Sequence, residues 1–333
     1  MTSTPEPLQS PAFAFGMHCE LVIANYRNAT LSVPALAHGE TLETKELLQW
    51  GDIPDDGKYT LESHLAHLAN RMSINSGRPV VLLGARNNLV NFRCPISLDG
   101  SVYGVKGEEP LQSRRPYYGI GYSNGKFSCD TLLAGGSEPC LWDFFCAGVP
   151  VLWDDWDDER LFSVMLCEAA DQSHLFELPR GNHPEATDQS RKTWQTLHHV
   201  FVQHLHDDYE STASALHLAL RALRPHPRLC HTYFHSVVGV NRSNHLFCLF
   251  AHGSLLTLGK LLRQRGCFRA VCLENSGSVM PTYIPPKNRS VPIPLCRAPN
   301  FRNKGRALIY IELANAAFSP ISFTDSSISD DQP

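Results

Sequence analysis

The stretch 235–280 reads HSVVGVNRSNHLFCLFAHGSLLTLGKLLRQRGCFRAVCLENSGSVM. Three apolar runs, at 236–240, 246–251 and 270–273, have the length of buried strands. Between the second and the third run, leucines recur at helical spacing over 255–262, which predicts a helix with one apolar face. The expected order is therefore strand, strand, helix, strand, with polar turns between the elements.

The last of these strands leads into a polar turn of small residues. Glu274 follows the apolar run directly, and Asn275, Gly277 and Ser278 come next. A strand fixes the carboxylate at its end, and a Gly/Ser turn exposes backbone N–H groups that can hold an anion. This pattern predicts a functional site at the end of the strand.

The rest of the chain is divided between short strands and helices. Further strands are expected within 17–35 and at 79–83, 149–153 and 307–313, with hairpin turns at 98–101 (LDGS) and 123–126 (SNGK). Residues 156–230 are different in character, because a long helical pattern runs over 191–223 and polar loops surround it. The fold class expected is α+β, a largely β body with packed helices and a helical insertion at about 156–230.

The expected organisation is one domain between two tails. Residues 15–320 are predicted to form the domain, residues 1–14 a disordered tail and residues 321–333 a mobile tail rich in serine and aspartate. The first residues have neither a basic segment nor an apolar segment of the kind that a secretory signal needs, so none is expected.

Bulk properties restrict the class of protein. The 333 residues are 43% hydrophobic and carry a formal net charge of −4, which argues against a general nucleic-acid binder. No apolar run is long enough for a membrane span. The eleven cysteines are odd in number and form no C-x-x-C pair, which predicts reduced thiols in a cytoplasmic protein. The sequence does not determine the oligomeric state.

The order of the segments resembles the phosphodiester glycosidase family, which includes N-acetylglucosamine-1-phosphodiester α-N-acetylglucosaminidase-like domains. That family has a Gly-Pro-x-Leu strand, an Arg-Thr-Ala-Ile-Gly strand, a Leu-x-x-Leu helix and a strand that ends Leu-Asp-Gly-Gly-Gly-Ser. The similar pieces here follow in the same order: AGVPVL at 147–152, HSVVG at 235–239, the leucines at 255–262 and LENSGS at 273–278. An Asn-Gly-Gly-Phe-Phe-like turn of the family falls on 83–92.

This chain departs from the family pattern at several positions. The family arginine falls on His235 and the family aspartate on Glu274. Two motif glycines fall on Asn275 and Ser276, whereas Gly277 agrees with the motif. Since histidine can carry a positive charge and glutamate a negative one, the same distribution of charge is expected with altered geometry.

The resemblance implies a hydrolase that cleaves a glycosyl phosphodiester or a related sugar–phosphate bond. Such a site must bind the phosphate, steady an oxocarbenium-like carbon and activate water. Glu274 is the expected base or cation stabiliser, and His235 and Arg86 are expected to bind the phosphate. The further substrate-binding residues expected are Asn87, Asn275, Gly277 and Ser278. A small sugar phosphate is the expected partner, and neither a cofactor nor a metal is expected.

Two alternatives stay open at this point. The altered turn at 274–278 also suits a non-catalytic ligand-binding module on the same fold. A biosynthetic enzyme could pass the same glycosyl cation to an acceptor other than water.

Other patterns in the chain favour surface or packing roles. The run LHHVFVQHLHDD at 197–208 contains metal-ligand residue types, but not at the spacing of a histidine pair on one helix face. The run WDDWDD at 153–158 combines rings and carboxylates, as sugar sites do, and equally suits a solvated loop with anchoring tryptophans. Neither a G-x-S-x-G nor a P-loop motif is present.

Overall fold

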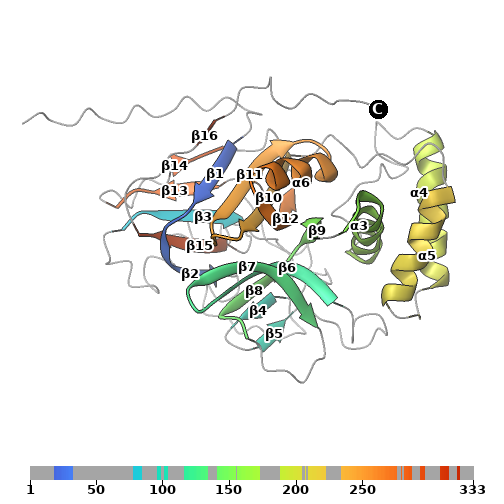
Figure 1. The fold of residues 1–333 in the computed structure, drawn as a ribbon, viewed down its shortest axis with the longest axis horizontal. Coiled ribbons are helices and arrows are strands. Elements are labelled where there is room, and N and C mark those ends of the chain that lie inside the picture. Colours follow the sequence, from blue (N-terminus) through green and yellow to red (C-terminus); the bar gives the residue numbers. More distant parts are fainter. Residues whose placement is uncertain are drawn as a thin grey trace, which may run out of the picture.

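The structure is a computed structural model, and it describes residues 19–32, 78–84, 96–98, 101–103, 116–133, 141–154, 156–172, 188–204, 207, 209–222, 234–275, 279, 281–286, 293–296, 308–314 and 321–322. Within these ranges it contains three antiparallel sheets and four helices, which is the α+β class expected (Figure 1). The predicted tail at 1–14 lies outside the described residues. Of the tail predicted at 321–333, only the first two residues are described, and they form a short strand.

The central sheet has six strands in the order β16-β1-β11-β10-β12-β9. Their bounds are β16 Ile321–Ser322, β1 Cys19–Ile23, β11 Leu246–His252, β10 Phe234–Asn241, β12 Cys267–Asn275 and β9 Val149–Trp153. The predicted strand–strand–helix–strand unit is confirmed, and it supplies the middle of this sheet. The three strands of this unit, β10, β11 and β12, extend one to three residues beyond the predicted bounds at one or both ends. The strand β9 has the predicted bounds.

Two five-stranded sheets complete the body. The second sheet has the order β14-β13-β3-β15-β2, with bounds β14 Ile293–Pro294, β13 Thr282–Ile284, β3 Val80–Gly84, β15 Leu308–Leu313 and β2 Tyr26–Ser32. The third sheet has the order β5-β4-β8-β6-β7, with bounds β5 Ser101–Tyr103, β4 Ile96–Leu98, β8 Phe144–Ala147, β6 Pro116–Ser123 and β7 Lys126–Leu133.

The residues of the turns explain two of the hairpins, β6–β7 in the third sheet and β10–β11 in the central sheet. Between β6 and β7, Asn124 has φ 50° and Gly125 has φ 75°, the left-handed conformations that a two-residue hairpin turn requires. Between β10 and β11, the Asn241 side chain accepts hydrogen bonds from the backbone N–H groups of Ser243 and His245 at 3.0 and 2.9 Å. A side chain that satisfies the turn in this way fixes the register of the strands on either side.

The chain passes from the third sheet to the central sheet at Gly148, which lies between β8 and β9. Its N–H donates to the Tyr118 carbonyl at 2.7 Å. A Cβ atom at this position would lie 2.6 Å from the Cys272 carbonyl oxygen of β12. Only glycine allows the backbone to cross this close to the strand that carries Glu274.

One helix covers the central sheet directly. The helix α6, Leu255–Gln264, begins at Ser254, whose hydroxyl accepts from the Thr257 N–H at 3.1 Å. Its buried face consists of Leu255, Leu258, Gly259 and Leu262. A Cβ atom at Gly259 would collide with the Val151 carbonyl of β9, so the helix backbone rests on the strand itself. The expected apolar stripe is confirmed.

Three helices fall within the predicted insertion: α3 Asp158–Gln172, α4 Asp188–Gln203 and α5 Tyr209–Ala222. Figure 1 shows α3 between β9 and the α4–α5 pair. The helical pattern expected over 191–223 is therefore two helices and not one. The chain turns after α4, where the Asp207 N–H donates to the His204 carbonyl at 3.0 Å and the Thr212 hydroxyl donates to the same oxygen at 3.0 Å.

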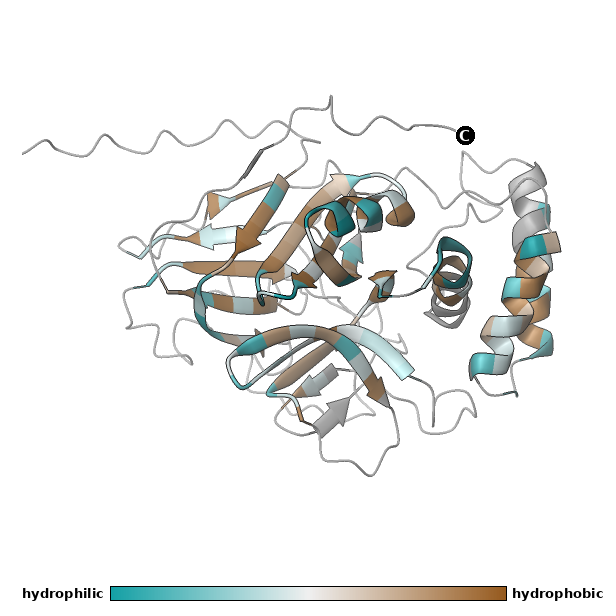
Figure 2. Ribbon diagram, in the orientation of Figure 1, coloured by the Kyte–Doolittle hydropathy of each residue, from teal (hydrophilic) through white to brown (hydrophobic). Residues whose placement is uncertain are grey.

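The hydrophobic core lies between the central sheet and its neighbours. Figure 2 shows hydrophobic residues concentrated along the strands, whereas hydrophilic residues lie at hairpin turns and on parts of the helices. Cys129 of β7 contacts the Val238 carbonyl at 4.0 Å, so the third sheet packs against the central sheet. None of the helices in the described ranges has the length and apolarity that a membrane crossing requires.

Cysteines contribute to this core as thiols. In the described part of the chain, Cys19, Cys129, Cys146, Cys248, Cys267, Cys272 and Cys296 are buried, and none forms a disulfide. Burial raises the pKa of Cys267 to about 12 and the pKa of Cys248 well above its ordinary value. These groups stay protonated at neutral pH and pack as small hydrophobic side chains.

Candidate functional site

Three neighbouring strands of the central sheet, β11, β10 and β12, bring chemically active side chains together at one end of the strands. The first residues of β10 pair with the last residues of β11, Phe234 with His252 and His235 with Ala251. The same residues of β10 pair with the last residues of β12, His235 with Asn275 and Ser236 with Glu274. Antiparallel pairing therefore places segments from 235, 252 and 274 side by side.

Glu274 is the penultimate residue of β12 and is only 7% exposed. It lies opposite Ser236 in the register. A carboxylate with so little contact with water stays charged only where hydrogen bonds or a positive charge compensate for lost hydration. The position matches the expectation of a carboxylate fixed at the end of a buried strand.

His235 is buried too, at 3% exposure. Its Nδ1 lies 3.8 Å from the Cys272 thiol, whose sulfur also lies 3.5 Å from the Glu274 carbonyl oxygen. Burial, with a smaller contribution from His252, lowers the pKa of His235 to about 3. His235 is therefore neutral at neutral pH, which does not fit the expectation that it brings a positive charge to a phosphate.

The register also separates the two expected catalytic side chains. Residues directly opposite each other in an antiparallel pair share a face of the sheet, and neighbours along a strand point to opposite faces. Glu274 thus shares a face with Ser236, whereas His235 contacts Cys272 on the other face. The register shift between Ser236 and Val237 places one extra residue of β12 between Cys272 and Glu274, so these two residues face opposite sides although they are two apart. The two residues are close in the backbone but face different sides.

The remaining expected site residues lie mostly outside the described ranges. These are Arg86, Asn87, Gly277 and Ser278. Asn275 is the last residue of β12, and its backbone pairs with that of His235. The strand β3, which precedes Arg86, ends at Gly84 in the second sheet.

Ser236 was not singled out from the sequence. It is 1% exposed, and its Oγ has no hydrogen-bond partner within the described part of the molecule. A buried hydroxyl in this state costs about 1–3 kcal/mol, which calls for a functional explanation. The signal in the sequence was a hydroxyl residue inside the apolar strand 236–240.

A second group of residues has the composition of a hydrolytic triad but not its chemistry. Ser163 Oγ lies 3.3 Å from His217 Nδ1, and His217 Nε2 lies 3.7 Å from Glu159 Oε2. The Ser163 hydroxyl donates to the Glu159 carbonyl at 2.8 Å, so its proton is directed at its own helix and away from the imidazole. Ser163 is also 1% exposed. This group joins α3 to α5.

The histidine-rich run at 197–208 holds no metal-binding group within the residues that the structure describes. His198 and His199 are exposed on α4. His204 Nδ1 instead pairs with Asp207 Oδ2 at 2.7 Å, where α4 ends. His198 and His199 therefore lie on the surface of α4, and His204 pairs with Asp207 where the helix ends.

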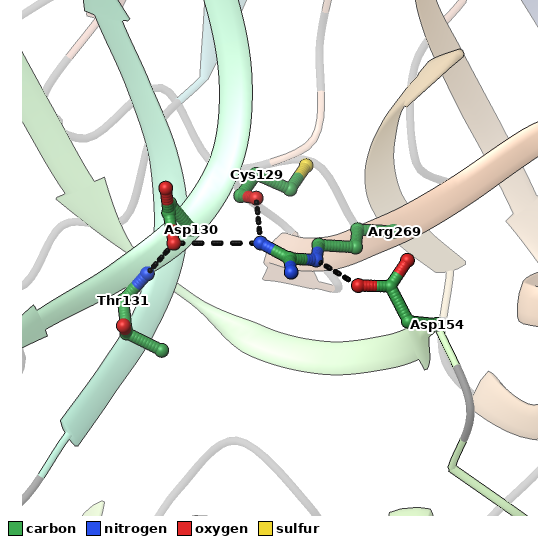
Figure 3. A network of polar contacts seen from close by, with 5 residues as sticks. All are labelled: Cys129, Asp130, Thr131, Asp154 and Arg269. Carbon is green, nitrogen blue, oxygen red and sulfur yellow. Dashed lines mark hydrogen bonds and ion pairs between the residues drawn. The ribbon is translucent and has the colours of Figure 1, made fainter. Parts of the chain in front are cut away.

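The tryptophan–aspartate run at 153–158 is part of the packing between sheets. Trp153 is buried, and its ring meets the Tyr118 ring edge-on with centroids 4.9 Å apart. The Arg269 guanidinium lies 4.9 Å from the centroid of the Trp153 ring. The same guanidinium pairs with Asp154 and Asp130 (Figure 3). The ring of Trp153 is thus occupied by the protein itself.

Comparisons with known proteins show only weak likeness. No family model matches the chain, and no curated protein is similar to it in sequence. The catalytic domain of zebrafish N-acetylglucosamine-1-phosphodiester alpha-N-acetylglucosaminidase, auto-inhibited by its pro-peptide, is 11% identical, with a TM-score of 0.37 over 90% of this chain and 73% of that one. A hypothetical protein from Synechocystis is 11% identical, with a TM-score of 0.20 over 71% of this chain and 46% of that one.

Proposed function

We propose that this protein is a hydrolase that cleaves a glycosyl phosphodiester or a related sugar–phosphate bond. The observation that carries the proposal is the position of Glu274, a carboxylate almost removed from water, at the end of a central strand and opposite the buried Ser236 hydroxyl. Buried carboxylates with polar neighbours at a strand end are typical of catalytic sites.

The proposed roles follow from what the reaction requires. As the C1–O bond breaks, its electron pair goes to the phosphate oxygen, and the anomeric carbon becomes positive. Glu274 either stabilises that cation or takes the proton of the attacking water. Since His235 is neutral near pH 7, its role is to support the strand end by hydrogen bonding, and Arg86 is the proposed cation for the phosphate. Asn87, Asn275, Gly277 and Ser278 complete the proposed substrate contacts.

A second candidate function is a non-catalytic module that binds a sugar phosphate. The observation that favours it is the burial of His235, because the expected positive charge is missing at that position. The two functions differ in turnover: the hydrolase converts its ligand into products, whereas the binding module releases it unchanged.

The test is turnover by the full chain on a panel of glycosyl 1-phosphodiesters, compared with the Glu274→Gln variant. Removal of a general base or a cation stabiliser is expected to lower kcat by about 10²–10⁴-fold. Glu20→Gln is the matched control, because Glu20 is a buried strand carboxylate of the same sheet, held by Arg265 Nε at 3.0 Å. Its kcat per folded molecule is expected to match that of the wild type.

Mass spectrometry of the products, with and without added alcohol acceptors, separates hydrolysis from glycosyl transfer. Full activity in Glu274→Gln would remove Glu274 from the mechanism. Calorimetric binding of the diesters without any product would favour the binding module.

A further inference from the structure

His252, at the end of β11, lies on the same face of the central sheet as Glu274. His252 is opposite Phe234, and Ser236, two residues further along β10, is opposite Glu274. Because residues two apart on a strand share a face, Phe234, Ser236, Glu274 and His252 all point to one side. The register irregularity of β10 and β12 falls after Ser236, so it does not alter this assignment.

The position of His252 differs from that of His235 in access to water. His252 is partly exposed, whereas His235 is 3% exposed. The His252 and Phe234 rings meet in a T-shaped arrangement with centroids 5.2 Å apart and planes at 69°. Gly253 follows with φ 149°, a conformation that favours glycine, and α6 begins after Ser254. The imidazole is thus held by a neighbouring ring at the point where the chain leaves the sheet.

The elements around His252 contribute three titratable groups. The strand β10 contributes His235, whose pKa is lowered in part by the charge of His252. The strand β12 contributes Glu274, which shares the face of His252. The strand β1 contributes the Cys19 thiol opposite Phe250, and the first turn of α6 has no acidic residue. Among these groups, Glu274 is the carboxylate that shares a face of the sheet with His252.

We propose that His252 is the histidine that carries the positive charge toward the phosphate of a bound glycosyl phosphodiester. The proposal rests on the proposed function in its choice of ligand. In the reaction, the C1–O bond breaks with its electron pair going to the phosphate oxygen. The imidazolium donates a hydrogen bond to that oxygen, water forms the new bond to C1, and Glu274 accepts the proton of the water.

The test measures binding of a methyl ester of a C-glycosyl phosphonate, which cannot be hydrolysed at C1. This probe carries one negative charge throughout pH 5–8, so any pH dependence of its affinity belongs to the protein. For the wild type we expect the affinity to fall by about tenfold as pH rises from 5 to 8, since the proposed contact requires the protonated imidazole. For His252→Gln we expect weaker binding at pH 5 and no fall between pH 5 and pH 8.

The matched control is His245→Gln, at the other end of β11, which is expected to bind the probe as the wild type does. Nitrogen-15 resonances of the imidazole provide a second readout. Saturating probe is expected to raise the pKa of His252 by about one unit, since a tenfold preference for the charged form corresponds to that shift.

The outcomes separate this inference from the proposed function. Binding whose pH dependence persists in His252→Gln, a pKa of His252 that the probe does not move, or no binding by the wild type would each overturn it. Diester cleavage that depends on Glu274 but not on His252 would leave the hydrolase standing without this role. Probe binding that depends on His252, with no diester cleaved, would support the role of His252 and refute the hydrolase.

Discussion

Arg269 donates through Nε to Asp154 Oδ2 at 2.6 Å, which joins the start of β12 to the residue that follows β9. The same guanidinium reaches the third sheet, where Nη1 lies 3.2 Å from the Cys129 carbonyl and 3.4 Å from Asp130 Oδ1 (Figure 3). One side chain therefore links three strands of two sheets at the end of β12 opposite to Glu274. This arrangement fixes the strand that carries the candidate site.

Arg269→Ala is expected to lower the free energy of unfolding by about 1–3 kcal/mol. The loss combines partly exposed ion pairs, a hydrogen bond to a carbonyl and the contact with the Trp153 ring. Chemical denaturation measures it, with Arg263→Ala on α6 as the control with the same change of charge. Arg269→Lys should recover only part of the loss, because a lysine cannot donate in two directions from a planar group. A variant as stable as the wild type would show that the link contributes nothing.

Gly259→Ala is expected to destabilise the protein by about 1–3 kcal/mol, although alanine is the better helix former. The added methyl group would meet the Val151 carbonyl, so α6 must move away from β9. Thermal denaturation should show a lower Tm. An increase in Tm would show that the helix does not rest on the strand in this way.

His235 should make the protein less stable in acid. Its pKa of about 3 in the folded state is below the ordinary value of 6.5, so the unfolded chain binds a proton first as pH falls. Stability contributed by the neutral imidazole is present above pH 6.5 and is lost as pH falls toward 3, by at most about 1.4 kcal/mol for each pH unit.

The measurement is urea denaturation of wild type and His235→Asn between pH 7 and pH 4. The difference in unfolding free energy between the two proteins should shrink as pH falls. His198→Asn, an exposed position on α4, is the control and should follow the wild type at every pH. A constant difference for His235→Asn would contradict the lowered pKa.

Ser163 should not behave as a nucleophile. Its hydroxyl donates to the Glu159 carbonyl, and the residue is buried between α3 and α5. Exposure to a fluorophosphonate probe is expected to leave this residue unmodified in intact-mass and peptide analysis. Ser163→Ala should cost about 1 kcal/mol of stability and leave turnover of the diester panel unchanged. A covalent adduct that disappears in Ser163→Ala would refute this assignment.

Much of the fold follows from the order of apolar runs and turn residues. The strands at 149–153 and 234–275 were predictable because each is an apolar run flanked by polar or turn-forming residues. The break between α4 and α5 was missed because leucines recur at helical spacing on both sides of it, as they would in one continuous helix. The acidic pair Asp207-Asp208 before the second helix was the available signal for a new helix start.

The site was less predictable than the fold because it depends on register. The sequence predicted Glu274 at the end of a strand, and in the structure it is the penultimate residue of β12. Which side chains share its face of the sheet follows only from how β10, β11 and β12 pair. Sequence also could not give the burial of His235, and hence its loss of positive charge. His252 was not predicted as a site residue, because the apolar run 246–251 predicts the strand without it and a single histidine after a strand is no motif.

The crossing at Gly148 has a consequence for motion in this molecule. One unbroken backbone belongs to both the third sheet and the central sheet, and it touches β12 two residues from Glu274. A motion that separated the third sheet from the central sheet would have to bend the backbone at Gly148, where even a Cβ atom would lie 2.6 Å from the Cys272 carbonyl oxygen. Any opening that admits a ligand is therefore expected to move the peripheral segments around a rigid β frame.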